Sequence, residues 1–90
     1  MINNLPPFEL VPFSEQFDET LNTLDTGEAL SWLDCHIKYT IQMRDHYQAE
    51  MFKTANDDPK LPGIAHAYWV DSNNLYRLKI LQDEIKKELG

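Results

Sequence analysis

Apolar residues recur every three or four positions through most of this chain, a spacing typical of amphipathic helices. The segment from residue 28 to residue 54 contains no glycine or proline and keeps this spacing for about seven helical turns. The pattern predicts a long helix over 27–55. Its main apolar stripe consists of Leu30, Leu33, Ile37, Ile41, Tyr47 and Met51.

A second apolar stripe runs beside the first on the same segment. It consists of Trp32, His36, Tyr39 and Met43. Because one stripe is enough to pack a helix against one neighbour, two stripes indicate that this helix is covered from more than one side.

A second long helix is predicted over 64–89, after a loop at 56–63 that contains two prolines and a glycine. The start of this segment, 64–70, has aromatic and branched residues that also suit a strand. Its two alanines and its continuity with the later stripe favour a helix. The polar run 71–74 is a point where the helix can kink or restart. The later stripe consists of Leu75, Leu78, Leu81, Ile85 and Leu89.

The first 13 residues contain three prolines and predict an extended arm rather than a helix. The arm is too apolar for a free tail, so we expect it to pack on its own helices or on a neighbouring chain. Ser14 is a candidate N-cap for a short helix over 14–25, in which Phe17, Leu21 and Leu24 share one face.

Together these segments predict an all-α fold in a single domain, 1–90. We expect a helical hairpin of two long antiparallel helices, because a short connection places consecutive helices antiparallel. A short N-terminal helix and the extended proline-rich arm complete the expected architecture.

The chain is acidic, with a net charge of −7, and the negative charge is concentrated near its N-terminus. Residues 1–30 hold six acidic residues and no lysine or arginine. This balance argues against direct nucleic-acid binding, because phosphates attract basic side chains. It favours a protein partner with a basic surface. The predicted acidic patch for that partner consists of Asp18, Glu19, Asp25 and Glu28.

Aromatic residues are frequent for so small a chain, with two Trp, four Tyr and four Phe. They can fill the core, form an interface or line a pocket that stacks on a nucleobase. We expect part of them to form a surface for a partner or for self-association as a dimer or higher homo-oligomer. That predicted stripe consists of Trp32, Tyr39, Met43, Tyr47, Trp69 and Tyr76.

No residue pattern predicts catalysis, a cofactor or a metal site. His46 and Glu50 share a helical face, but no matching ligand motif occurs elsewhere. Cys35 and His36 are adjacent and therefore point in different directions on a helix. The sequence also lacks a glycine-rich phosphate loop and a glycine-flanked serine. We therefore expect a protein that is not an enzyme.

The expected location is the cytoplasm, with no membrane contact. The single cysteine suits a reducing compartment, and the N-terminus does not resemble a signal peptide. No apolar run approaches the ~20 residues that span a bilayer.

The sequence thus favours a small acidic protein-interaction module that docks on a partner protein as an inhibitor, antitoxin-like factor or adaptor. Bacteriophage accessory and anti-defence proteins are often of this kind. One alternative is a structural assembly subunit of a virion or larger complex. Another is a helical nucleotide-binding or nucleotide-hydrolysing protein.

Overall fold

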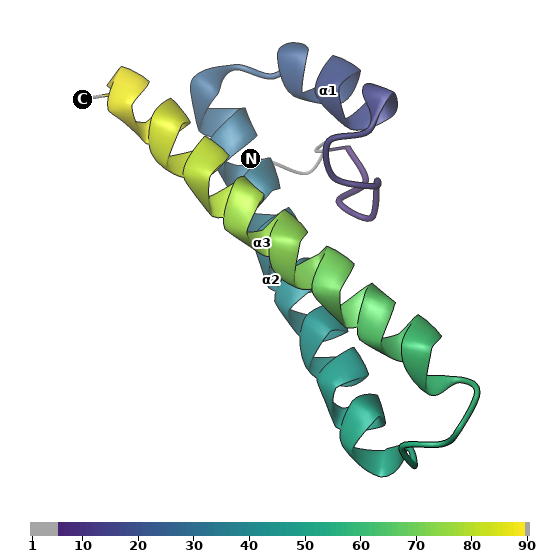
Figure 1. The fold of residues 1–90 in the computed structure, drawn as a ribbon. Coiled ribbons are helices and arrows are strands. Elements are labelled where there is room, and N and C mark those ends of the chain that lie inside the picture. Colours follow the sequence, from purple (N-terminus) through teal and green to yellow (C-terminus); the bar gives the residue numbers. More distant parts are fainter. Residues whose placement is uncertain (1–5, 90) are drawn as a thin grey trace.

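The fold is an all-α helical hairpin, as the sequence predicts. The computed structural model describes residues 6–89, and three helices make up most of this range (Figure 1). They are α1 (Glu15–Asn22), α2 (Thr26–Lys53) and α3 (Leu61–Leu89), and residues 6–89 contain no strand. Helices α2 and α3 pack against each other along the hairpin.

Side-chain caps fix where the first two helices begin. The Ser14 hydroxyl accepts a hydrogen bond from the Phe17 N–H at 3.2 Å and starts α1. Asp25 and Glu28 start α2 by a reciprocal pair of bonds, in which each side chain accepts from the other residue's backbone N–H at 2.8 and 3.1 Å. Such a capping box satisfies N–H groups that have no partner inside the helix. Only three residues, 23–25, connect α1 to α2.

Helix α3 begins at Leu61, so Pro62 and Gly63 belong to its first turn and not to the loop. A proline is tolerated there because the first N–H groups of a helix lack a carbonyl partner in any case. The segment 64–70 is helical, and α3 continues through 71–74 without a break. The polar residues of this run therefore interrupt the apolar stripe of the helix but do not end the helix.

The hydrophobic core lies where all three helices meet, at the end of the hairpin remote from the connecting loop. Its buried residues are Phe17 from α1, Trp32, Leu33 and Ile37 from α2, and Leu75 and Leu78 from α3. The arm packs on its own chain here, because the Trp32 indole N–H donates to the carbonyl oxygens of Pro6 and Pro7 at 3.0 and 3.2 Å.

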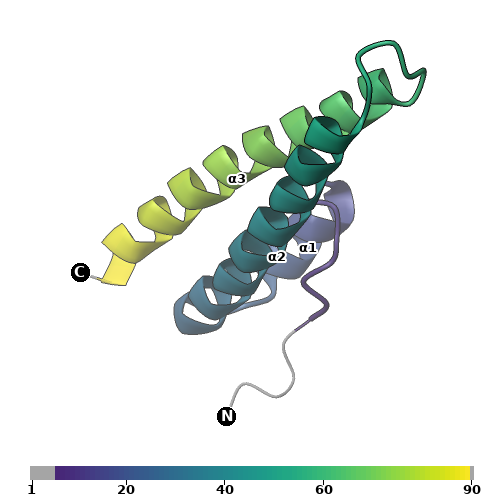
Figure 2. The same ribbon diagram turned by 90° about the horizontal axis from the view of Figure 1, so that it is seen from below.

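The opposite half of the hairpin has no such core. We call residues 41–53 of α2 and 61–74 of α3 the loop-side half, and none of them is buried. Helix α1 packs only at the other end, where the two long helices diverge (Figure 2). The radius of gyration is accordingly 15.3 Å, against about 12 Å for a compact chain of this length.

The two tryptophans provide a matched test of this core. Trp32 is 0% exposed, whereas Trp69 is 63% exposed. We expect Trp32→Ala to lower the free energy of unfolding by about 3–5 kcal/mol, because it leaves a cavity where three helices and the arm meet. Trp69→Ala should change it by no more than about 0.5 kcal/mol. Urea unfolding followed by circular dichroism measures both, and equal losses would contradict this assignment of the core.

Candidate functional site

The four residues of the acidic patch are all exposed, at the end of the hairpin remote from the loop. Asp18 and Glu19 lie on α1. Asp25 and Glu28 form the capping box of α2, so they have a structural role in addition to their charge. Asp18 and Glu19 can therefore be altered without removing a helix cap.

The six residues of the predicted aromatic and apolar stripe do not share one surface. Trp32 is buried, because it occupies the point where the helices meet and its ring stacks on Phe17 with centroids 5.0 Å apart. It is therefore part of the core and not of a surface stripe. Trp69 and Tyr76 are exposed on α3, whereas the other three residues are half-buried and line a groove: Tyr39, Met43 and Tyr47.

Three large apolar side chains are exposed on one face of α3, and the exposed Asn73 lies between two of them, Trp69 and Tyr76. Trp69, Tyr76 and Ile80 are spaced by seven and four positions, which places them on one side of the helix. Their exposed fractions are 63%, 67% and 42%. We call these three residues the α3 stripe.

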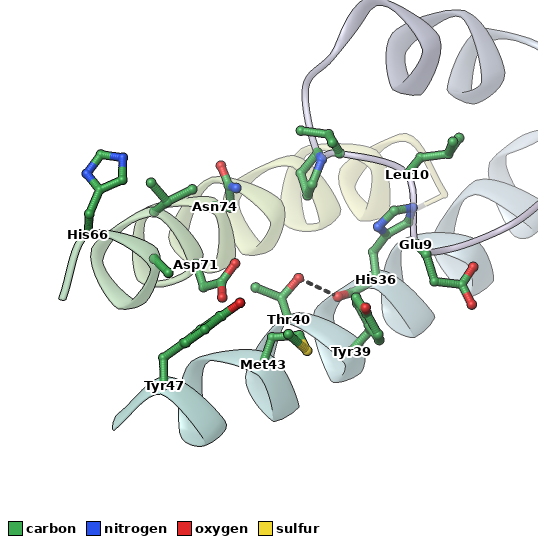
Figure 3. Close-up of a pocket in the computed structure, with 14 residues that line it drawn as sticks. Glu9, Leu10, His36, Tyr39, Thr40, Met43, Tyr47, His66, Asp71 and Asn74 are labelled. Atoms are coloured by element: carbon green, nitrogen blue, oxygen red, sulfur yellow. Dashed lines mark hydrogen bonds between the residues drawn. The ribbon is translucent and has the colours of Figure 1, made fainter. Parts of the chain in front are cut away.

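A groove of about 410 Å³ lies between the arm, α2 and α3 (Figure 3). Helix α2 lines the groove with one of its faces. The residues on this face are spaced by four, three and four positions: His36, Thr40, Met43 and Tyr47. Tyr39 lies beside them. The arm contributes residues 9–12, and α3 contributes His66, Ala67, Val70, Asp71 and Asn74.

His36 forms the buried end of this groove and is held among aromatic rings. It is 1% exposed and meets Phe17 and Trp32 edge to face, with ring centroids 5.1 and 4.5 Å apart. Burial lowers the pKa of His36 to about 4, although the nearby Glu9 carboxylate acts in the opposite direction. Among the described residues its Nε2 atom has no hydrogen-bond partner. The imidazole is therefore neutral at pH 7.

Asp71 places a carboxylate in the groove from the α3 side. It is four residues before Leu75 and seven before Leu78, and so lies in line with the buried residues of α3. Partial burial raises the pKa of Asp71. The two ion pairs of residues 6–89 join Lys38 to Asp34 and Arg44 to Asp45, so neither compensates the Asp71 charge.

Two polar side chains of α2, Tyr47 and Thr40, lie across the groove from Asp71. Figure 3 shows the Tyr47 hydroxyl and the Asp71 carboxylate pointing toward each other. The Thr40 hydroxyl lies between the two helices and donates to the His36 carbonyl oxygen at 2.7 Å. The groove thus combines an apolar lining with a few fixed polar groups, as ligand sites usually do.

The sequence analysis did not assign Glu9, Thr40, Asp71 or Asn74 to any site. The available signal was the polar run 71–74, which we interpreted only as a point of bending. Two of its residues, Asp71 and Asn74, are among the polar groups that α3 presents to the groove, together with His66. Their relation to the arm could not be inferred from spacing, since the arm is far away in sequence.

Residues 6–89 contain no group of three or more His, Cys, Asp or Glu side chains placed to hold a metal ion. None of the helices in this range combines the length and the apolar character needed to cross a membrane.

Comparisons of the chain with protein-family models, with curated proteins and with solved structures found no match.

The buried imidazole makes stability depend on pH. Since the folded-state pKa of His36 is about 4 and the unfolded value is about 6.5, the unfolded chain takes up a proton first as the pH falls. The His36 contribution is thus complete above pH ~6.5, and about 3 kcal/mol is lost between pH ~6.5 and ~4.

His36→Phe keeps a ring between Phe17 and Trp32 and removes this titration. We expect the free energy of unfolding to fall less steeply in the variant than in the unaltered protein over this range. The difference between the two curves isolates His36 from Asp71, whose raised pKa gives the opposite slope. Parallel curves in urea titrations from pH 7 to pH 4 would contradict the lowered pKa.

Proposed function

We propose that this protein is a small acidic interaction module that docks on a partner protein through the α3 stripe. The observation that carries the proposal is the exposure of Trp69, Tyr76 and Ile80 together on one face of α3. Trp and Tyr are the residues that contribute most to protein interfaces, because they bury a large area and keep a polar group for hydrogen bonding. Large apolar side chains that are exposed together on one face of a small protein are typical of an interaction site.

The shape of the hairpin supports the same proposal. The loop-side half has no buried residue, so its two helices stabilise each other without a third layer. A partner that covers Trp69, the one residue of the α3 stripe in this half, would supply that layer. A second copy of this chain could also do so, and self-association through the α3 stripe is part of the proposal.

Charge supports a partner with a basic surface. The net charge is −7, and Asp18 and Glu19 are exposed on α1. Opposite charges on two proteins accelerate their encounter more than they strengthen the final complex. We therefore assign the affinity for the partner to the α3 stripe and the rate of association with it to the acidic patch. Inhibitor, antitoxin-like factor and adaptor are all roles that need docking alone, and a cytoplasmic location suits the single cysteine.

The first test alters the α3 stripe. Trp69→Asp combined with Tyr76→Asp should abolish binding to partners that the unaltered protein captures from a lysate, as quantified by mass spectrometry. It should also lower the mass that light scattering reports at high concentration. The control is Phe52→Asp, which also replaces an exposed aromatic residue by aspartate, at a position of α2 that is 84% exposed. An unchanged partner list and mass, with helicity retained, would refute docking through the α3 stripe.

The second test separates approach from affinity once a partner is identified. Asp18→Asn with Glu19→Gln removes two charges without touching the capping box, and should slow association severalfold and flatten its dependence on salt. Asp57→Asn with Asp83→Asn removes the same charge from exposed positions elsewhere and serves as the control. If both doubles change the on-rate equally in surface plasmon resonance, only net charge matters and the acidic patch has no specific role.

A further inference from the structure

The groove carries a charge pattern that the docking proposal does not use. With its histidines, His36 and His66, counted as neutral, its formal charges come from Glu9 on the arm and Asp71 on α3, and no lysine or arginine is among the described residues that line it. His36 adds no positive charge, since burial lowers its pKa to about 4. The groove is therefore electronegative at pH 7.

We infer that the groove is a binding site for a protonated aliphatic amine, with the ammonium group at Asp71 and the hydrocarbon chain along the apolar lining. The same chemistry is available from a free alkylamine and from a lysine side chain. The inference is independent of the α3 stripe. The groove residues Val70, Asp71 and Asn74 lie on the side of α3 away from Tyr76. His66 at the edge of the groove stacks on Trp69, with ring centroids 6.4 Å apart.

The need for a cation follows from the state of Asp71. A carboxylate that is partly shielded from water without a partner favours its neutral form, and this explains why partial burial raises the pKa of Asp71. Neither ion pair of residues 6–89 involves it. An ammonium ion would supply the missing opposite charge and up to three hydrogen-bond donors. The hydroxyl of Tyr47 points to the same place (Figure 3) and offers an acceptor for one of them.

The need for an aliphatic chain follows from the rest of the lining. Leu10, Met43 and Val70 present apolar side chains to the groove. The rings of Tyr39 and Tyr47 also line it, and aromatic rings attract cations as well as hydrocarbon. A volume of about 410 Å³ is within the range of about 300–1,000 Å³ that is usual for small-molecule sites.

Other ligand classes fit less well. Phosphates and carboxylates would be repelled by Glu9 and Asp71, which argues against a nucleotide in this groove. A neutral apolar molecule would cover Asp71 without compensating its charge. A metal ion would need more ligands than the described residues bring together here.

The test compares three probes of equal chain length by ¹⁵N–¹H NMR titration of the full chain. We expect n-hexylammonium to saturate with a dissociation constant on the order of 1 mM and to shift the amide signals of Thr40, Met43 and Asp71. The neutral 1-hexanol should bind at least about fivefold more weakly, and hexanoate should not saturate. Equal binding of hexylammonium and hexanol would overturn the inference, as would shifts that do not cluster at the groove.

Two groove variants and one control, each of which replaces a carboxylate by an amide of the same shape, locate the ammonium. Asp71→Asn should weaken hexylammonium binding about fivefold or more. Asp83→Asn, which removes the same charge from an exposed position of α3, should leave it unchanged. Because the Asp71 change lies between helices, Glu9→Gln on the exposed arm provides a second variant that does not disturb the hairpin, with a smaller loss expected. Unchanged affinity in both groove variants would overturn the inference.

Two further measurements are needed. One distinguishes a free amine from a lysine side chain, and the other distinguishes amine binding in the groove from docking through the α3 stripe. A capped Gly-Lys-Gly peptide that binds more tightly than hexylammonium identifies a lysine of a partner, whereas the reverse order identifies a free amine. The variant with Trp69→Asp and Tyr76→Asp should retain hexylammonium binding. If the unaltered protein does not bind hexylammonium, the proposal of docking through the α3 stripe is unaffected. If docking through the α3 stripe fails, the inference about the groove is unaffected.

Discussion

The packing of Trp32 against Phe17 is the contact on which the rest of the structure depends. Trp32 is 0% exposed, its ring stacks on Phe17 from α1, and its indole N–H donates to two carbonyl oxygens of the arm. One side chain of α2 therefore holds α1 and the arm in place. Without it, α1 is too short to be stable in isolation, and the arm would lose its hydrogen bonds to the hairpin. The groove would lose one wall as well, since residues 9–12 follow directly after the anchored prolines.

The position of this contact also explains why the hairpin is uneven. The core needs three elements, and α1 reaches only the end where α2 begins, because the capping box of Asp25 and Glu28 leaves a connection of three residues. Along α3 the buried residues Leu78 and Leu75 are followed, four residues toward the loop, by Asp71. A half-buried carboxylate cannot extend an apolar core. The core therefore stops at this point, and the groove opens where it stops.

The periodicity of apolar residues was sufficient to predict the fold, because the 3.6-residue repeat and the glycine and proline breaks depend on local chemistry alone. It did not predict that α3 starts at Leu61, since the first turn of a helix accepts Pro62 where a later turn would not. Nor did it separate Trp32 from Trp69. Both occupy apolar positions on long helices, and which one is buried depends on where α1 and the arm cross. The groove was missed for the same reason, because it joins three segments that are distant in sequence.

The two proposed surfaces make different demands on the fold. The α3 stripe needs only a stable helix, because its residues are exposed and spaced by the helix itself. The groove needs the arm to stay in place and needs Asp71 to remain between the helices, where its charge opposes folding. An apolar residue at this position would extend the stripe of Leu75 and Leu78 and would stabilise the hairpin. A residue that makes a small fold less stable than it could be is one for which a binding role supplies a physical reason. In this protein that residue stands at the boundary between the core and the groove.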